Sequence, residues 1–160
     1  MKTPEQGMGS TSMDSMVKML ASATEQQRRE MIRTRLSAFA QANDADRING
    51  MKMMVQAINK LDRKSAEKLA YTRLESLAED FDATTRKKLM KTHMNIVADL
   101  PENQMAVELR TMVSVMGQCH EECKMKNMST LKELMSEMPQ DRKDMIVQQL
   151  PADTKKMLMG

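Results

Sequence analysis

The residues with the richest potential chemistry lie in one ten-residue stretch of the chain. Cys119, His120 and Cys123 are followed closely by Met125 and Met128. Thiolate and thioether sulfur atoms select Cu(I), and a thiol whose pKa is lowered by basic neighbours becomes a reactive nucleophile. A Cu(I) or redox-linked protein that uses Cys119 and Cys123 is therefore one alternative for the function.

Two observations argue against a metal or redox centre. No second cysteine and histidine pair is present to complete a structural zinc site, because His93 is the only other histidine. Cys119 also falls at a repeat position that elsewhere holds Leu61, Leu100 and Met138. We therefore interpret this cysteine as a small buried hydrophobe, predict no metal and no cofactor, and keep Cys119, His120 and Cys123 only as candidate ligands.

The sequence also argues against catalysis. It has two histidines and five glycines, and it lacks both a nucleophile paired with a base and a glycine-rich loop that would hold phosphate. His93 falls at a repeat position that elsewhere holds Met54, Leu74, Met112 and Leu131, so we expect it to be partly buried and hydrogen-bonded. We predict a non-enzymatic protein.

The elements that would position any site repeat about every 19 residues. The expected helix ends are Ala42, Leu61, Phe81, Leu100, Cys119 and Met138, which lie 19, 20, 19, 19 and 19 residues apart. Apolar residues recur three and ten positions before the last five of these ends. This spacing predicts a string of similar amphipathic helices.

Capping residues and short connections set the expected architecture. The expected N-caps are Thr24, Asp62 or Ser65, and Asp82 or Thr84. Pro101 is suited to a first helical turn. Short connections place successive helices antiparallel. We predict an all-α fold of tandem antiparallel helices, either an α-solenoid or a helical bundle, with a flexible tail over residues 1–14 and a single helical-repeat domain over residues 15–160.

The repeat resembles known helical arrays. A helix-pair period near 38 residues is similar to the general class of HEAT and TPR repeats, although the motif residues of neither are present. Over about 20 residues, Met138-Pro139 and Leu150-Pro151 open units that resemble the short helices of FliG-type and MgtE-type amino-terminal domains. These resemblances imply a helical repeat and carry no specific function.

Composition restricts the environment and the partners. The net charge of +3 is a small excess, and aromatic residues are only 2% of the chain, which argues against nucleic acid as a partner. No run approaches the roughly 18 apolar residues that span a bilayer, so we expect no transmembrane segment. Two cysteines without a secretory signal favour an intracellular, reducing compartment, either the cytoplasm or an organelle matrix.

Basic pairs recur near three expected helix starts, where the helix dipole favours acidic residues. A stripe made by these pairs would bind RNA, an anionic membrane surface or an acidic protein, and this is the second alternative for the function. The candidate stripe residues are Arg28, Arg29, Arg86, Lys87, Arg142 and Lys143.

The leading hypothesis is a structural or adaptor protein. The chain has 21 methionines, whose flexible and polarisable side chains repack around varied surfaces. Helical grooves lined by methionine would bind a partner protein or a multi-subunit complex. The candidate partner-binding residues are Met105, Met112, Met116, Met128 and Met135.

Overall fold

Helices account for nearly all of the described chain. The computed structural model describes residues 10–159. Its helices are α2 (Ser10–Ser22), α3 (Glu25–Gln41), α4 (Asp44–Asn59), α5 (Arg63–Glu79), α6 (Ala83–Ala98), α7 (Glu102–Gln118), α8 (Glu121–Glu137), α9 (Gln140–Val147) and α10 (Ala152–Met159). The all-α fold predicted from the repeat is confirmed.

Side-chain caps define where the N-terminal helices begin. Thr24 and Gln27 form a reciprocal capping box at the start of α3, with hydrogen bonds of 3.2 and 3.1 Å. Asn43, Asp62 and Asp82 each accept a hydrogen bond from the backbone three residues later. The expected cap positions are therefore resolved in favour of Asp62 and Asp82, and each leaves one fewer backbone donor unpaired.

The first described helix begins earlier than expected. The tail was predicted to extend to residue 14, but α2 starts at Ser10. Val17 and Leu20 of α2 are buried, which ties this helix to the rest of the chain. Residues 1–9 of the predicted tail lie outside the described residues.

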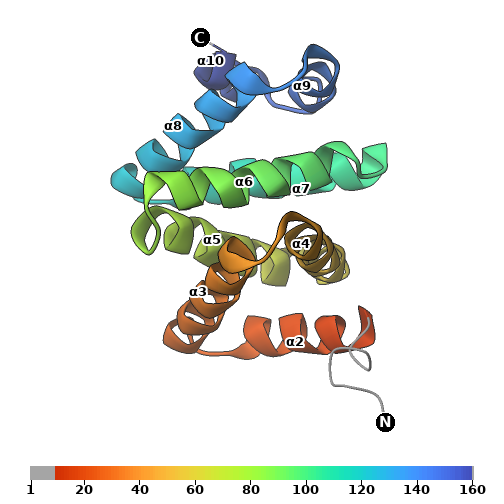
Figure 1. Cartoon of the computed structure of the whole chain (residues 1–160), viewed down its shortest axis with the longest axis vertical. Coiled ribbons are helices and arrows are strands. Elements are labelled where there is room, and N and C mark those ends of the chain that lie inside the picture. Colours follow the sequence, from red (N-terminus) through yellow and green to blue (C-terminus); the bar gives the residue numbers. More distant parts are fainter. Residues whose placement is uncertain (1–9, 160) are drawn as a thin grey trace.

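The helices form an open stack (Figure 1). Extensive packing joins α2 to α4, α3 to α5, α4 to α6, α5 to α7, α6 to α8 and α8 to α10. Within the described range, no extensively packed pair is more than three helices apart in chain order, and α2 and α10 lie at opposite ends of the long axis. The arrangement is that of a solenoid-like array, in which each helix contacts near neighbours in sequence.

The core follows the repeat positions. Three residues before the expected helix ends, Ile58, Ala78, Val97, Met116 and Met135 are all buried. The core has few aromatic side chains, so methionines fill much of its volume. The buried methionines are Met51, Met54, Met90, Met94, Met105, Met112, Met116 and Met135.

Three buried arginines, which we call the arginine clamps, secure helix junctions. Arg28, Arg47 and Arg86 each lie four residues after an N-cap and are 6–7% exposed. Each guanidinium donates to backbone carbonyls at or just after the end of the preceding helix. Arg28 donates to the carbonyls of Leu20 and Ala23, Arg47 to that of Ala42, and Arg86 to those of Leu77, Ala78 and Phe81.

Candidate functional site

An apolar cavity near the C-terminal end brings methionines from four helices together. We call it the Met groove, and its volume is about 210 Å³. Its methionines are Met94 from α6, Met112 and Met116 from α7, Met128 and Met135 from α8, and Met157 from α10. Four of the five candidate partner-binding methionines therefore converge on one surface, whereas Met105 lies apart from the groove and is 2% exposed.

The floor and the edge of the Met groove differ in exposure. Met112, Met116 and Met135 are buried, Met128 is half-buried, and Met157 is 42% exposed. Ile146 and Leu150 complete the apolar wall, and Lys124, Asp153 and Thr154 supply the polar lining. An apolar concavity with a few polar groups is typical of a site that receives an apolar side chain or ligand.

The two cysteines are buried and unsuited to thiolate chemistry. Both are free thiols, and Cys123 is fully buried with its Sγ 3.7 Å from the carbonyl oxygen of Leu74. Burial, followed by the neighbouring thiol of Cys119, raises the pKa of Cys123 to about 12. Burial also raises the pKa of Cys119. The alternative of a reactive thiolate at Cys123 finds no support in this environment, because desolvation outweighs the effect of basic neighbours.

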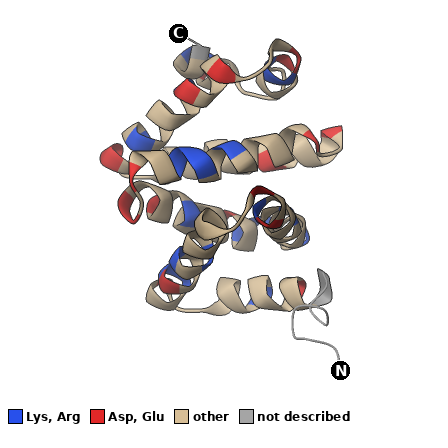
Figure 2. Ribbon diagram, viewed as in Figure 1, with Lys and Arg blue, Asp and Glu red and all other residues tan. Residues whose placement is uncertain are grey.

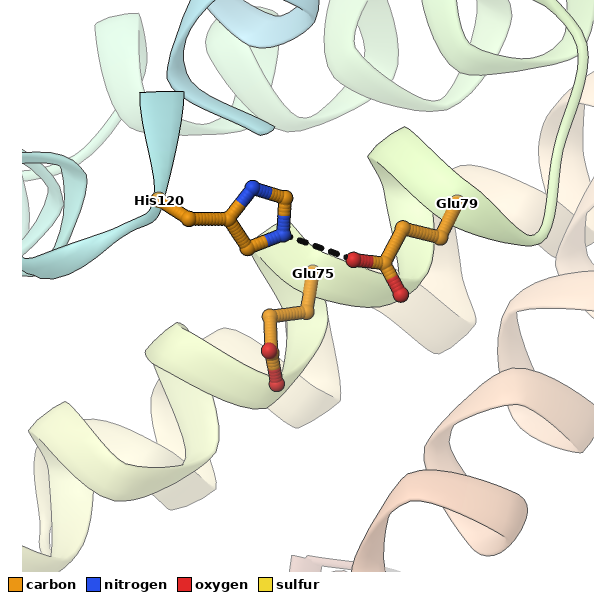
Figure 3. Close-up of side chains that lie close together, drawn as sticks. All are labelled: Glu75, Glu79 and His120. Carbon is orange, nitrogen blue, oxygen red and sulfur yellow. Dashed lines mark hydrogen bonds and ion pairs between the residues drawn. The ribbon is translucent and has the colours of Figure 1, made fainter. Parts of the chain in front are cut away.

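His120 has a different structural role from Cys119 and Cys123. It is the N-cap of α8, and its Nδ1 accepts a hydrogen bond from the backbone N–H of Cys123 at 3.3 Å. Its Nε2 lies 2.8 Å from Glu79 Oε1, and Figure 3 shows the ring directed toward the Glu79 carboxylate. One ligand atom from each of Glu75, Glu79 and His120 lies within 4.8 Å of the others.

Arg29 holds the same carboxylates from α3. It donates to Glu79 Oε2 and to Asp80 Oδ2, both at 2.9 Å, and lies 3.8 Å from Glu75 Oε1. Burial raises the pKa of Glu75, whereas hydrogen bonds from Arg29 and then His120 lower the pKa of Glu79. Glu75 is therefore the carboxylate of this group whose negative charge is least well compensated.

The predicted basic stripe is divided by the fold. Arg28 and Arg86 are arginine clamps, so they are buried and cannot form part of an exposed stripe. Arg29 pairs with α5, Lys87 pairs with Glu133 and Glu137 at 2.8 and 2.9 Å, and Arg142 pairs with Asp99 at 2.9 Å. Lys143 is half-buried on α9. The six residues therefore do not form one continuous exposed surface.

A different set of basic residues lines a groove between α4 and α6. Lys52, Lys88 and Lys91 are exposed there, over an apolar floor that includes Ile48 and Ile96, and the groove volume is about 580 Å³. Figure 2 shows the concentration of basic residues along α6. We call this surface the lysine groove. Sequence reasoning missed it because Lys52 and Lys91 become neighbours only through the packing of α4 on α6.

His93 belongs to a buried charged group that the sequence did not reveal. Its Nε2 lies 3.1 Å from Glu108 Oε1, and Arg73 Nη2 lies 3.6 Å from the same oxygen. His93 is buried as expected, but within the described range neither of its ring nitrogens has a hydrogen-bond partner. The polar partner of His93 is therefore the Glu108 carboxylate, which it meets at hydrogen-bond distance but outside hydrogen-bond angles.

Comparisons with known proteins found no match, so the fold is the main guide to the function. No protein-family model, no curated protein and no solved structure matches this chain. The all-helical array is compatible with the generic helical-repeat resemblance, and no specific family is shown. In the part of the chain that the structure describes, no helix has the length and apolar character needed to cross a membrane.

Proposed function

We propose that this protein is a non-enzymatic adaptor whose Met groove receives the apolar face of a helix from a partner protein. The observation that carries the proposal is the convergence of Met112, Met116, Met128 and Met135 around space that the chain does not fill itself. Methionine side chains adapt to a partner at low steric cost, as helix-in-groove recognition requires.

The chain's own α10 indicates what kind of partner fits. This helix of eight residues packs against α8 and contributes Met157 and Leu158 to the groove lining. The surface thus already accommodates a short amphipathic helix with apolar anchors. We infer that a partner helix presents Leu, Met or Phe at positions i, i+3 or i+4, and i+7, and places polar groups opposite Lys124 and Asp153.

Two substitutions on α8 form a matched test. Met128→Lys places a charge in the groove lining, whereas Met125→Lys alters a side chain that is 64% exposed and does not line the groove. The tagged wild type and both variants would be isolated from their own source at moderate salt and analysed by native mass spectrometry. Affinity for the recovered partner would then be measured with purified components.

The proposal predicts a stoichiometric partner that binds Met125→Lys like the wild type and Met128→Lys at least about tenfold more weakly. Circular dichroism would confirm that both variants keep their helical content. Absence of a stoichiometric partner would contradict the proposal, as would equal binding by the two folded variants.

The lysine groove supports a second candidate function, the binding of an acidic segment of a partner protein. Lys52, Lys88 and Lys91 form no ion pair with a carboxylate within the described residues, and Lys88 donates only to the carbonyl of Ala40. Charge complementarity over an apolar floor favours an acidic amphipathic segment. A Lys52→Glu, Lys91→Glu variant should abolish binding of a Glu-rich helical peptide, whereas Lys132→Glu on exposed α8 surface should not.

The dependence of binding on salt concentration distinguishes the two candidate functions. Binding in the lysine groove should weaken steeply between low and physiological ionic strength, and binding in the Met groove should change little. Binding of RNA or of phosphatidylserine vesicles by the lysine groove, without binding of the acidic peptide, would contradict the second candidate and favour a polyanion site.

A further inference from the structure

We infer that Glu75, Glu79 and His120 form a binding site for one divalent transition-metal ion of the Zn²⁺ class. The three side chains come from two elements, the adjacent turns of α5 and the N-cap of α8. Their ligand atoms lie within 4.8 Å of one another, so small side-chain adjustments bring all three to bonding distance of a single ion. Figure 3 shows His120 facing Glu79, with Glu75 one turn away on the same helix.

The net negative charge around these three side chains favours the binding of a divalent cation. Glu75, Glu79 and Asp80 carry three negative charges, Arg29 supplies one positive charge, and the surplus is therefore two negative charges. His120 is neutral in this arrangement, because its Nδ1 accepts the hydrogen bond from Cys123 and is not protonated. A bound divalent ion would cancel this surplus.

Arg29 helps to orient Glu75 and Glu79 but does not use all of their carboxylate oxygen atoms. It holds Glu79 through Oε2, which leaves Oε1 directed toward His120, and its distance of 3.8 Å from Glu75 is too long for a hydrogen bond. Ligating carboxylates are commonly held by such outer partners. Two carboxylates and one imidazole suit Zn²⁺, Co²⁺ or Ni²⁺ better than Mg²⁺ or Ca²⁺, which prefer oxygen ligands alone.

Binding changes the protonation pattern of His120. The Nε2–H that now faces Glu79 must leave Nε2 so that its lone pair can bind the metal, and a proton must occupy Nδ1 through solvent exchange. The capping hydrogen bond from Cys123 is then lost. This bond is 3.3 Å long, so the loss is small, and the metal replaces the Glu79 contact of the imidazole with a direct bond.

Isosteric variants test the site by calorimetric titration of reduced protein with Zn²⁺. Glu75→Gln removes one ligand, and His120→Asn removes the imidazole while it keeps a good N-cap. The matched control is Glu133→Gln, Glu137→Gln, because these residues form a similar pair on α8 with a cationic partner, Lys87, and no histidine. We expect one ion per chain, at least about tenfold weaker binding in each site variant, and an unchanged control.

Three results would overturn the inference. The first is the absence of stoichiometric Zn²⁺ binding to the wild type. The second is equal affinity for Mg²⁺ and Zn²⁺, which would show that the histidine contributes nothing. The third is a Co²⁺ complex with an intense thiolate charge-transfer band, which would assign the metal to Cys119 and Cys123. Circular dichroism of each variant would ensure that lost binding reports on the site and not on unfolding.

Discussion

The N-terminal and C-terminal halves of the stack hold their helix junctions in different ways. From α3 to α6, every helix has a side-chain cap, and three of the four junctions contain an arginine clamp. The equivalent positions in the C-terminal half hold Met105, Lys124 and Lys143, and Pro101 and Pro139 begin helices without a side-chain cap. Directional polar contacts therefore fix most junctions of the N-terminal half, whereas the C-terminal half, in which α8 but neither α7 nor α9 has a side-chain cap, relies more on adaptable apolar packing.

This difference coincides with the distribution of candidate functions. The Met groove lies among α6, α7, α8, α9 and α10, where junctions carry few directional restraints. Apolar packing alone tolerates rearrangement better than a network of buried hydrogen bonds does. A half-molecule that can repack is suited to receive a partner helix, and a rigid half is suited to support it.

The largest expected effect comes from breaking an arginine clamp. Arg86→Met should lower the free energy of unfolding by about 3 kcal/mol, because the carbonyls of Leu77, Ala78 and Phe81 lose their shared donor. Lys124→Met changes the equivalent position of α8 and should alter stability by less than about 0.5 kcal/mol. Urea unfolding of both variants measures the difference, and equal losses would remove the distinction between the halves.

The buried charged group at the boundary of the halves should make the protein sensitive to acid. Burial by itself raises the pKa of Glu108, but contact with His93 and the charge of Arg73 outweigh it and hold the pKa at about 2, below the ordinary 4.5. Burial lowers the pKa of His93 from the ordinary 6.5. For both groups the unfolded chain binds protons more readily, so stability should fall as the pH falls from about 6.5 toward about 2.

Substitutions assign that acid sensitivity to individual residues. His93→Leu should flatten the upper part of the stability profile, just below pH 6.5, and should also weaken the part below pH 4.5, because Glu108 loses the contact that lowers its pKa. Glu108→Gln should cost about 2 kcal/mol at pH 7, because Arg73, whose side chain is 12% exposed, loses its counterion, and should flatten the lower part. Urea midpoints measured across this pH range provide the test, and an unchanged profile in both variants would contradict the assignment.

The smallest effect compares the glycines of the two halves. An added Cβ at Gly50 would lie 2.6 Å from Phe39 Cε1, whereas a Cβ at Gly117 would meet no atom within 4 Å. Gly50→Ala should therefore destabilise the protein by about 1 kcal/mol despite the better helix propensity of alanine, and Gly117→Ala should stabilise it by up to about 0.5 kcal/mol. Thermal unfolding distinguishes the two, and stabilisation by Gly50→Ala would show that the α3 and α4 contact is loose.

The sequence predicted what depends on local spacing. The repeat positions gave the helix ends and the buried positions of Val97, Met116 and Met135, because apolar periodicity and caps act within one or two turns. It did not distinguish Arg28 from Arg29, although the first is buried in a junction and the second reaches α5. Their placement four and five residues after the N-cap was the available signal.

Sites that depend on stacking were beyond the sequence. The Met groove joins α6, α7, α8 and α10, and the proposed metal site joins α5 to the start of α8, so neither follows from spacing along one helix. Glu75 and Glu79 are four residues apart and could be read as a pair on one helical face. Their proximity to His120 depends on how α5 packs against α8.

Amide hydrogen exchange, measured on the free protein and on its complex with the partner recovered from its source, tests whether an adaptable C-terminal half receives the partner helix. We predict faster exchange in α8–α10 than in α3–α6 of the free protein, and protection on binding concentrated in helices that line the Met groove. Uniform exchange along the stack, or protection confined to α3–α5, would contradict this prediction.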